Sequence, residues 1–600
     1  MIYLRAYAEA PLTSRHVRDR AWAAAGAAFL IYVALSLVLW WQVWSGHPAT
    51  ALPCACGDPA QDSWFLAWGP AALAHGQNPF YSHMMFAPGG INMLANASVL
   101  GPSLVMAPVT LLWGPIASLN TILLVAPPLA GLAAYRFALK FATALPAFFA
   151  GLVYAFCPVV IADLALGHVN LVVGAVWLPL IALILYKILV EPQSSGRQPV
   201  VLGLALAGCA IGEFFTSTEL LAMAAVMSTV GIVLVCILYP TKVRPRMGYA
   251  VRALGSGAVA GLVVLAYPAW FALLGPQHLG QPIGGLLRLA GAPLDGIVAR
   301  PHLGANSFLA AFGYPGALPS NGAYLGVLPL IVLGAIVVWQ FRRPVIRWAA
   351  IMAVIAFLLS LGNKVNFDGS ATGFTGVHGP FAWLAHLPLV GDMNPARFAF
   401  FEFLFVGVIL AVGLQGVINT TWRARRTAVQ MGVAVTLGSA FVTPMATAWP
   451  PSFQASTVRT PGWVRLLSST DLGPHPVLLS YPLVTPKQDS SLLWQADAGM
   501  RWSNVGGYGL VPSAVLAGLA HSVIATRFDA YLKGHPSPAT TGELAAARAD
   551  LARRGVTIIV ARHQGADPGG ATAFIERVTG HPGRLVGTDR LWLYPASSWK

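Results

Sequence analysis

Long apolar runs fill the chain up to residue 449, and short clusters of basic residues separate them. Many of these runs hold about 20 residues, the length that an α-helix needs to cross the hydrocarbon core of a bilayer. The first spans are predicted at about 22–44, 117–135, 144–162 and 168–190. We therefore expect a polytopic α-helical membrane protein with about eleven transmembrane helices, the alternative count being about twelve or thirteen.

The apolar segment 97–113 is expected not to cross the membrane. It contains Pro102 and Pro108, and each proline removes a backbone hydrogen bond from a helix. When the spans are counted back from the basic loops, both ends of this segment also fall on the same side. We expect a re-entrant or interfacial helical segment, so that residues 45–113 form one long folded cap.

The pattern changes after residue 449, where no run is long enough to span. Short apolar runs at 477–483, 556–562 and 590–595 are typical of buried strands. Residues 543–555 and 571–580 are typical of amphipathic helices that end in glycine. Strands that alternate with helices predict a small α/β domain over 450–600, following a transmembrane domain over 1–449.

Composition and charge agree with a membrane protein. The chain is 56% hydrophobic and 10% charged, whereas soluble domains carry roughly 25% charged residues. The net charge of +15 could suggest nucleic acid, but the basic residues gather in short loops between apolar runs, which is the topological bias of membrane proteins. We exclude nucleic acid as a partner and expect a plasma (inner) membrane protein with a cytoplasmic N-terminus and an extracytoplasmic C-terminal domain.

The five cysteines predict neither a disulfide framework nor a metal centre. Cys54 and Cys56 form a C-x-C pair whose members sit too close to bridge without strain. No C-x-x-C or HExxH motif is present. We assign no cofactor and no metal ligand, although scattered carboxylates are compatible with a divalent metal ion.

The polar stretch 54–96 carries the sharpest candidates for chemistry. Asp58 and Asp62 follow the first span directly, and ionisable groups at membrane-helix ends are by default a functional-site hypothesis. Two structural alternatives remain: Asp58 before Pro59 can be a helix N-cap, and Asp62 can simply complement the helix dipole.

Other candidates lie at the outer ends of predicted spans or in the loops between them. Basic side chains could hold a lipid phosphate, and an aromatic ring could stack on a sugar or anchor at the bilayer interface. Snorkelling to the interface is the alternative for Arg397. The candidates are His168, Glu219, Arg288, Arg300, Arg397 and Trp64.

The pattern DP-x-x-D-x-W-x-x-AW, followed by HG-x-NPF and P-x-G-x-N, resembles a bacterial subgroup of the GT-C class of integral-membrane glycosyltransferases. The resemblance covers about residues 20–450 in architecture and is motif-specific over 57–96. It implies polyprenyl-phosphate sugars as donors and an aspartate of the first outer loop as catalytic base. The matching residue is Asp58, with Asp62 in support or in its place.

These observations favour a glycosyltransferase, hexosyl or pentosyl, that transfers a sugar from a polyprenyl-phosphate donor to a cell-envelope glycan or glycolipid. The bilayer, the donor and the acceptor are then its partners. The alternative is a non-enzymatic transporter, flippase subunit or envelope scaffold. No convincing internal repeat of the kind common in transporters is visible, which favours the enzyme.

Overall fold

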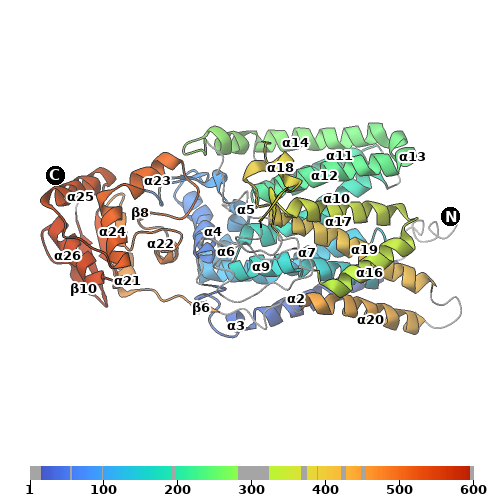
Figure 1. The fold of residues 1–600 in the computed structure, drawn as a ribbon, viewed down its shortest axis with the longest axis horizontal. Helices are drawn as coiled ribbons and strands as arrows, with labels where there is room; N and C mark the ends of the chain where they lie inside the picture. Colours follow the sequence, from blue (N-terminus) through green and yellow to red (C-terminus); the bar gives the residue numbers. More distant parts are fainter. Residues whose placement is uncertain are drawn as a thin grey trace.

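The computed structural model describes residues 15–54, 57–96, 99–191, 196–280, 323, 325–366, 374–387, 390–420, 427–446 and 455–594. The molecule is elongated, with a long helical bundle at one end and a smaller α/β domain at the other (Figure 1). Helices of the bundle run roughly along this long axis. The two parts correspond to the apolar and polar portions of the sequence.

Six described helices are long and apolar enough to cross a membrane, judged by length and composition, and a seventh span forms if α8 and α9, which are bent by 42° at their junction, count as one. The six are α2 (Arg15–Leu39), α7 (Pro115–Ala138), α10 (Val169–Leu189), α12 (Thr218–Leu238), α14 (Met247–Leu274) and α19 (Ala399–Thr420). The bent pair is α8 (Ala144–Ala155) and α9 (Pro158–Leu166). The prediction of a multi-pass helical membrane protein is confirmed.

Shorter apolar helices complete the bundle. They are α11 (Gln198–Phe214), α16 (Val327–Gln340), α17 (Pro344–Ser360) and the segment Gly432–Thr443 of α20 (Thr427–Ala446). The expected number of about eleven spans would require each of them to cross. That number, like the orientation of the chain, stays a prediction.

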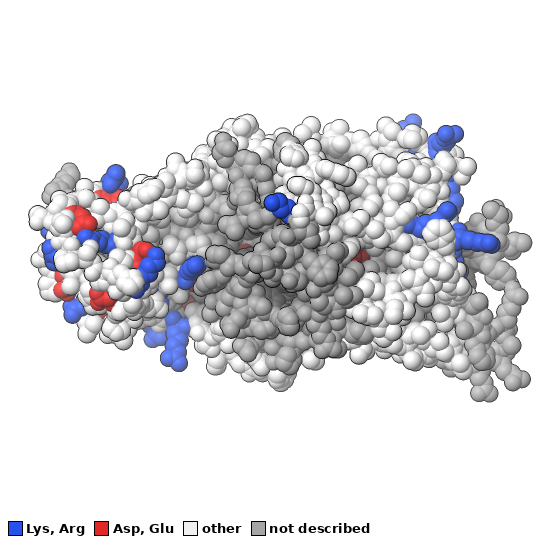
Figure 2. Space-filling view, in the orientation of Figure 1, with Lys and Arg blue, Asp and Glu red and all other residues white. Residues whose placement is uncertain are grey.

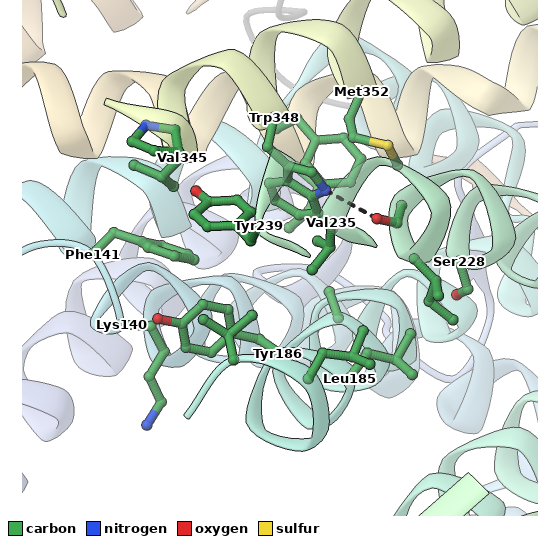
Figure 3. A pocket seen from close by; sticks show the side chains of 18 of the residues that line it. Lys140, Phe141, Leu185, Tyr186, Ser228, Val235, Tyr239, Val345, Trp348 and Met352 are labelled. Atoms are coloured by element: carbon green, nitrogen blue, oxygen red, sulfur yellow. Dashed lines mark hydrogen bonds between the residues drawn. The ribbon is translucent and has the colours of Figure 1, made fainter. Parts of the chain in front are cut away.

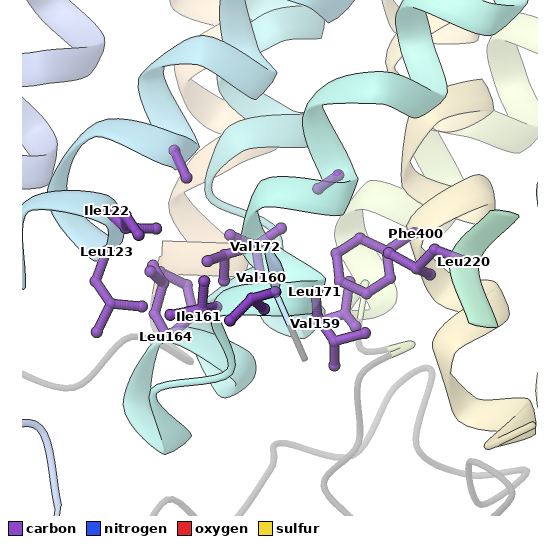
Figure 4. Packing of buried hydrophobic residues seen from close by; sticks show 14 of the residues in the cluster. Ile122, Leu123, Val159, Val160, Ile161, Leu164, Leu171, Val172, Leu220 and Phe400 are labelled. Carbon is purple, nitrogen blue, oxygen red and sulfur yellow. The ribbon is translucent and has the colours of Figure 1, made fainter. Parts of the chain in front are cut away.

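Apolar side chains from several helices form one continuous core in the bundle. Leu123 of α7, Ile161 of α9, Val172 of α10, Leu220 of α12 and Phe400 of α19 are all almost completely buried. Figure 4 shows these side chains converging from their separate helices. The core thus fixes the short turn between α9 and α10, which carries part of the candidate site.

The segment 97–113 forms two short helices rather than a span. Helix α5 (Leu100–Val105) and helix α6 (Ala107–Trp113) meet at Met106. At 1.5 Å per residue each is only about 10 Å long, too short to cross a bilayer. This agrees with the prediction that the segment makes no crossing.

The rest of the cap contains α4 (Asp58–Ala74), in which 13 residues are buried, and a small hairpin. The hairpin pairs β2 (Tyr81–Ser82) with β3 (Ile91–Asn92) in antiparallel register. A second pairing joins β1 (Ala51–Leu52) to β6 (Ser456–Thr457). The cap is therefore hydrogen-bonded to the chain that enters the C-terminal domain.

The C-terminal domain is built on a five-stranded sheet with the order β10-β11-β9-β7-β8. Strand β7 is parallel to β8 and β9, whereas β11 is antiparallel to β9 and β10. The strands are β7 (Val477–Tyr481), β8 (Ser503–Asn504), β9 (Ile558–Ala561), β10 (Arg584–Val586) and β11 (Asp589–Leu593).

Six helices accompany this sheet in the described part of the domain. They are α21 (Gly462–Ser469), α22 (Ser490–Asp497), α23 (Ser513–Ala520), α24 (Val523–Lys533), α25 (Thr541–Arg554) and α26 (Pro568–Thr579). The three predicted strands correspond to β7, β9 and β11, and the two predicted helices to α25 and α26. The prediction of a C-terminal α/β domain is confirmed.

Charge is distributed unevenly along the molecule. Figure 2 shows both signs of charge on the α/β domain, few charges on the visible flank of the bundle, and a group of Lys and Arg at the bundle's far end. Helix α13 (Pro240–Val243), which contains Lys242, lies at that far end (Figure 1). An apolar band between two charged ends is the pattern expected of a membrane-embedded bundle.

Candidate functional site

The start of α4 lies at the junction between the bundle and the C-terminal domain. Gly57 precedes the helix with φ +95, and a β-carbon there would come within 2.8 Å of the Pro486 carbonyl oxygen. Asp58 is the first residue of the helix and Gly57 is its N-cap, with no side-chain capping bond. The alternative prediction that Asp58 caps the helix is therefore wrong. Its carboxylate is directed to other partners.

His168 joins two of the carboxylates at this point. Its Nε2 lies 3.0 Å from Asp58 Oδ2, and its Nδ1 lies 2.9 Å from Asp163 Oδ1. Burial opposes charge on the imidazole, but the hydrogen bonds and charges of Asp58 and Asp163 outweigh it and raise the pKa of His168 to about 10. At neutral pH the ring is an imidazolium held between two carboxylates.

The turn that carries His168 is shaped by its neighbour. Gly167 adopts φ +73 at the end of α9, and a β-carbon there would lie 2.9 Å from Pro59 Cγ. A side chain at position 167 would be strained and would push α4 away. The glycine thus lets the α9–α10 turn approach the first turn of α4 closely enough for His168 to reach Asp58.

Asp62 lies one helical turn beyond Asp58 and faces the same turn. Its Oδ2 accepts a hydrogen bond of 2.9 Å from the Val169 backbone N–H. Burial raises the pKa of Asp62 to about 7, although the Val169 N–H and the positive His168 both oppose the shift. The structure therefore brings together three of the predicted site residues: Asp58, Asp62 and His168.

The C-terminal domain supplies the other side of the site. The Tyr508 hydroxyl donates a hydrogen bond to Asp58 Oδ1. Burial and the adjacent Asp58 carboxylate raise the pKa of Tyr508 well above its ordinary value, so the phenol keeps its proton. Asp58 is only 6% exposed in this arrangement. In this conformation both of its oxygens are engaged.

Two further charged groups lie where parallel strands end. Asp489 lies in the segment after β7, and Arg562 follows β9 directly. A β-carbon on Gly57 would lie 3.8 Å from Asp489 Oδ2. Burial raises the pKa of Asp489 to about 6, the charge of Asp58 adds to the shift, and Arg562 opposes it. The carboxyl ends of parallel strands are where α/β folds bind ligands, and here that edge faces α4.

Trp64 fixes α4 to the C-terminal domain. Its side chain is completely buried, stacks on Trp68 at a centroid distance of 5.8 Å, and donates from Nε1 to Gln495 Oε1 at 2.7 Å. No face of the indole is open to a sugar in this conformation. The structure therefore does not support the interpretation of Trp64 as a stacking platform and makes it an anchor of the junction instead.

Arg397 and Glu219 form an ion pair, with Arg397 in the short helix η6 (Pro395–Phe398) and Glu219 in the first turn of α12. Glu219 Oε1 also accepts a hydrogen bond of 2.6 Å from the Asn394 N–H. Within the described part of the chain, no hydrogen bond or ion pair joins either residue to Asp58 or Asp62. The other two predicted cations, Arg288 and Arg300, lie outside the described residues.

The described residues contain no group of three or more His, Cys, Asp or Glu side chains placed to hold a metal ion. The cysteine prediction needs a correction. Cys54 is disulfide-bonded, whereas Cys157, Cys209 and Cys236 are free. The prediction from the C-x-C spacing that Cys54 forms no disulfide is therefore wrong.

The fold and the site together define a multi-pass membrane protein whose candidate site lies between its helical bundle and a C-terminal α/β domain. No family model and no curated protein matches this chain. Among solved structures it is similar to ArnT from Cupriavidus metallidurans in the apo state, at 12% identity and a TM-score of 0.48, over 96% of this chain and 99% of that one.

Two structures from Archaeoglobus fulgidus are also similar. The oligosaccharyltransferase in the apo form is 13% identical with a TM-score of 0.47, over 93% of this chain and 71% of that one. The oligosaccharyltransferase AglB, in complex with an inhibitory peptide and a dolichol-phosphate, is 12% identical with a TM-score of 0.47, over 95% and 72%. Function is inferred below from the geometry of the site.

Proposed function

We propose that this protein is a plasma-membrane glycosyltransferase that moves a sugar from a polyprenyl-phosphate donor to a hydroxyl group of a cell-envelope glycan or glycolipid. One observation carries the proposal. The Asp58 carboxylate is held between the buried His168 imidazole and the Tyr508 phenol, at the contact between a membrane bundle and the edge of the α/β sheet where β7 and β9 end. A lipid-linked donor can reach this position from the bilayer.

The reaction needs a base and a way to stabilise a departing phosphate. Asp58 takes the proton from the acceptor hydroxyl, and the oxygen then forms a bond to the anomeric carbon of the sugar. The bond between that carbon and the phosphate oxygen breaks, and its electron pair stays on the polyprenyl phosphate. We assign charge stabilisation of this phosphate to Arg562, the cation beside Asp489. His168 keeps Asp58 oriented through its Nε2, which lies 3.0 Å from Asp58 Oδ2.

Tyr508 indicates where the acceptor hydroxyl binds. Its phenol donates to Asp58 Oδ1, as an acceptor hydroxyl must before it loses its proton. The acceptor would therefore replace the Tyr508 hydroxyl when the junction opens. The C-terminal domain would then hold the rest of the acceptor along the edge where β7 and β9 end.

The proposed orientation places the C-terminal domain outside the cell. Support comes from the group of Lys and Arg at the opposite end of the bundle (Figure 2), because positive residues concentrate in cytoplasmic loops. The disulfide at Cys54, close to the site, also agrees with an oxidising compartment.

The test is transfer by purified protein supplied with a panel of radiolabelled polyprenyl-phosphate sugars and envelope glycolipids. Asp58→Asn removes the base but keeps one of the two oxygens that accept hydrogen bonds, so we expect transfer to fall by about a hundredfold or more. Asp529→Asn is the matched control, because Asp529 is an exposed aspartate paired with Lys533. Unfolding temperature and size-exclusion profiles check that each variant folds.

Full activity in Asp58→Asn would overturn the assignment of the base. If Asp62→Asn abolishes transfer while Asp58→Asn does not, Asp62 is the base instead. Lack of transfer from every donor, together with lipid or solute movement in proteoliposomes, would favour the transporter alternative.

A further inference from the structure

A cavity lies inside the bundle, between α10, α12, α17 and α19, and has a volume of about 590 Å³. That volume is within the range of small-molecule and lipid sites, roughly 300–1,000 Å³. Most of its wall is aliphatic or aromatic, and Figure 3 shows Leu185, Val235, Trp348 and Met352 around it. None of the residues of the candidate site lines it.

The cavity is deep enough to take a hydrocarbon chain. On α10 alone its lining runs from Leu178 to Leu189, which corresponds to about 17 Å of helix. The indole of Trp348 donates to the Gly231 carbonyl oxygen at 3.3 Å, so this polar group of the wall is already satisfied (Figure 3). A long apolar slot of this kind favours an acyl chain over a polar solute.

One end of the lining is basic. Lys140, Lys242 and Arg343 belong to it, and helix α13, which carries Lys242, lies at the end of the bundle away from the C-terminal domain (Figure 1). Lys140 is paired with Glu191. Lys242 and Arg343 are exposed and form no ion pair with any described residue. This end therefore keeps a net positive charge.

Hydroxyl groups add hydrogen-bonding capacity at the same end. Tyr186 and Tyr239 line the cavity, and neither hydroxyl has a hydrogen bond to another described residue. The Lys242 ammonium lies 5.7 Å from the centre of the Tyr239 ring, which keeps this cation beside the cavity. Two cations and two phenols can thus surround one phosphate group.

We propose that this cavity binds one anionic phospholipid of the leaflet on the basic side of the membrane. Its phosphate group lies against Lys242 and Arg343, and one acyl chain fills the slot between α10 and α12. Basic pockets between transmembrane helices bind anionic headgroups in this way. A donor engaged at Asp58 would have its phosphate at the other end of the bundle, so the phospholipid is the occupant that the charge pattern favours.

The proposal is tested by native mass spectrometry of the full chain, purified in mild detergent and titrated with phosphatidylglycerol or with phosphatidylcholine of the same acyl chains. We expect one phosphatidylglycerol per chain and clearly weaker binding of phosphatidylcholine. Lys242→Ala combined with Arg343→Ala should weaken phosphatidylglycerol binding by about 30-fold, because two basic groups near the headgroup are lost. The charge-matched control is Arg244→Ala with Arg252→Ala, two exposed arginines outside the lining.

A second variant tests the slot without changing charge. Gly231 belongs to the lining, and a β-carbon there would lie 3.5 Å from the Met352 methyl carbon, an ordinary contact; Gly231→Leu therefore adds side-chain volume to the cavity wall. We expect about tenfold weaker phosphatidylglycerol binding. Gly208→Leu, on an open face of α11 with nothing within 4 Å, is the matched control and should bind as the unaltered protein does.

Four results would overturn the proposal. The first three are no retained phospholipid, equal binding of phosphatidylcholine, and stronger binding of polyprenyl phosphate than of phosphatidylglycerol at this site. The third of these would make the cavity a donor store. Unchanged binding in both the double variant and Gly231→Leu would also place the lipid elsewhere.

Discussion

Gln495 offers the sharpest test of how the C-terminal domain is held against the site. Its Oε1 accepts hydrogen bonds from Trp64 Nε1 at 2.7 Å and from Asn504 Nδ2 at 2.8 Å. Its Nε2 donates to the Met84 carbonyl at 2.8 Å and to the Trp502 carbonyl. The side chain is completely buried. One amide therefore links two parts of the cap, α4 and the Met84 segment, to the C-terminal domain.

Gln495→Leu keeps the volume of the side chain but removes all four bonds. The Met84 carbonyl retains a partner, since the Asn504 backbone N–H also donates to it at 2.8 Å. The Trp64 indole, the Asn504 amide and the Trp502 carbonyl lose theirs. A buried polar group left unsatisfied costs about 1–3 kcal/mol, so the three together cost about 3–9 kcal/mol. That is comparable with the whole stability of a domain, about 5–15 kcal/mol.

Hydrogen exchange and thermal unfolding measure this change directly. We expect Gln495→Leu to lower the unfolding temperature and to speed backbone exchange in α22 and at the start of α4. Gln564→Leu is the control, because the exposed Gln564 side chain makes no hydrogen bond to a described residue. If Gln495→Leu melts and exchanges like this control, the amide does not hold the junction and the reasoning fails.

Three further predictions concern individual groups. Tyr508→Phe should lower the KM for the acceptor by about tenfold with kcat kept, because a hydrogen bond to a charged group is worth about 1.5–3 kcal/mol; a fall in kcat would show instead that Tyr508 positions Asp58. The pKa of Asp62 rises from 3.8 to about 7 on folding, so this group's contribution to stability is present below pH 3.8 and lost as pH rises through 7. Asp62→Asn should flatten that part of a melting-temperature profile, and an unchanged profile would contradict it. Glu219→Gln leaves the partly buried Arg397 without its charge partner and should destabilise the protein by about 1–3 kcal/mol, measured by denaturant unfolding with Asp529→Asn as control.

Local pattern was enough to predict much of the fold. The β-branched and aliphatic runs that become β7, β9 and β11 are bounded by turn residues, and α25 and α26 end in glycines with φ of +66 and +84. Pro102 and Pro108 marked the broken helical segment of the cap, where α5 and α6 meet at Met106. Each of these signals is contained in about ten neighbouring residues.

Only part of the candidate site could be predicted, because some of its contacts join residues that are far apart in the chain. Asp58, Asp62 and His168 stood out because polar residues are rare near apolar runs. Tyr508 did not, since its bond to Asp58 depends on how a separate domain docks. For Trp64 the sequence left stacking on a sugar and anchoring at the bilayer interface as alternatives, and its burial against Gln495 depends on the docked domain.

The sequence contained a signal that could have identified Asp489 and Arg562 as candidate site residues. Arg562 is the last residue of the predicted strand 556–562, and Asp489 follows the predicted strand 477–483. Polar residues at the carboxyl ends of parallel strands mark the ligand-binding edge of an α/β sheet. What the sequence lacked was the direction of pairing, because β7 and β9 are parallel while β11 is antiparallel to β9. Without that direction the two residues could not be placed at one edge.

The bond between Tyr508 and Asp58 also has a consequence for biogenesis. The two residues are 450 positions apart in the chain, and ribosomes add roughly 5–20 residues per second. Asp58 must therefore wait roughly 20 to 90 seconds after its own synthesis for the partner that covers it. The Asp58 carboxylate is thus made early and is covered by Tyr508 late, so a chain that ends before the C-terminal domain would leave Asp58 without this partner.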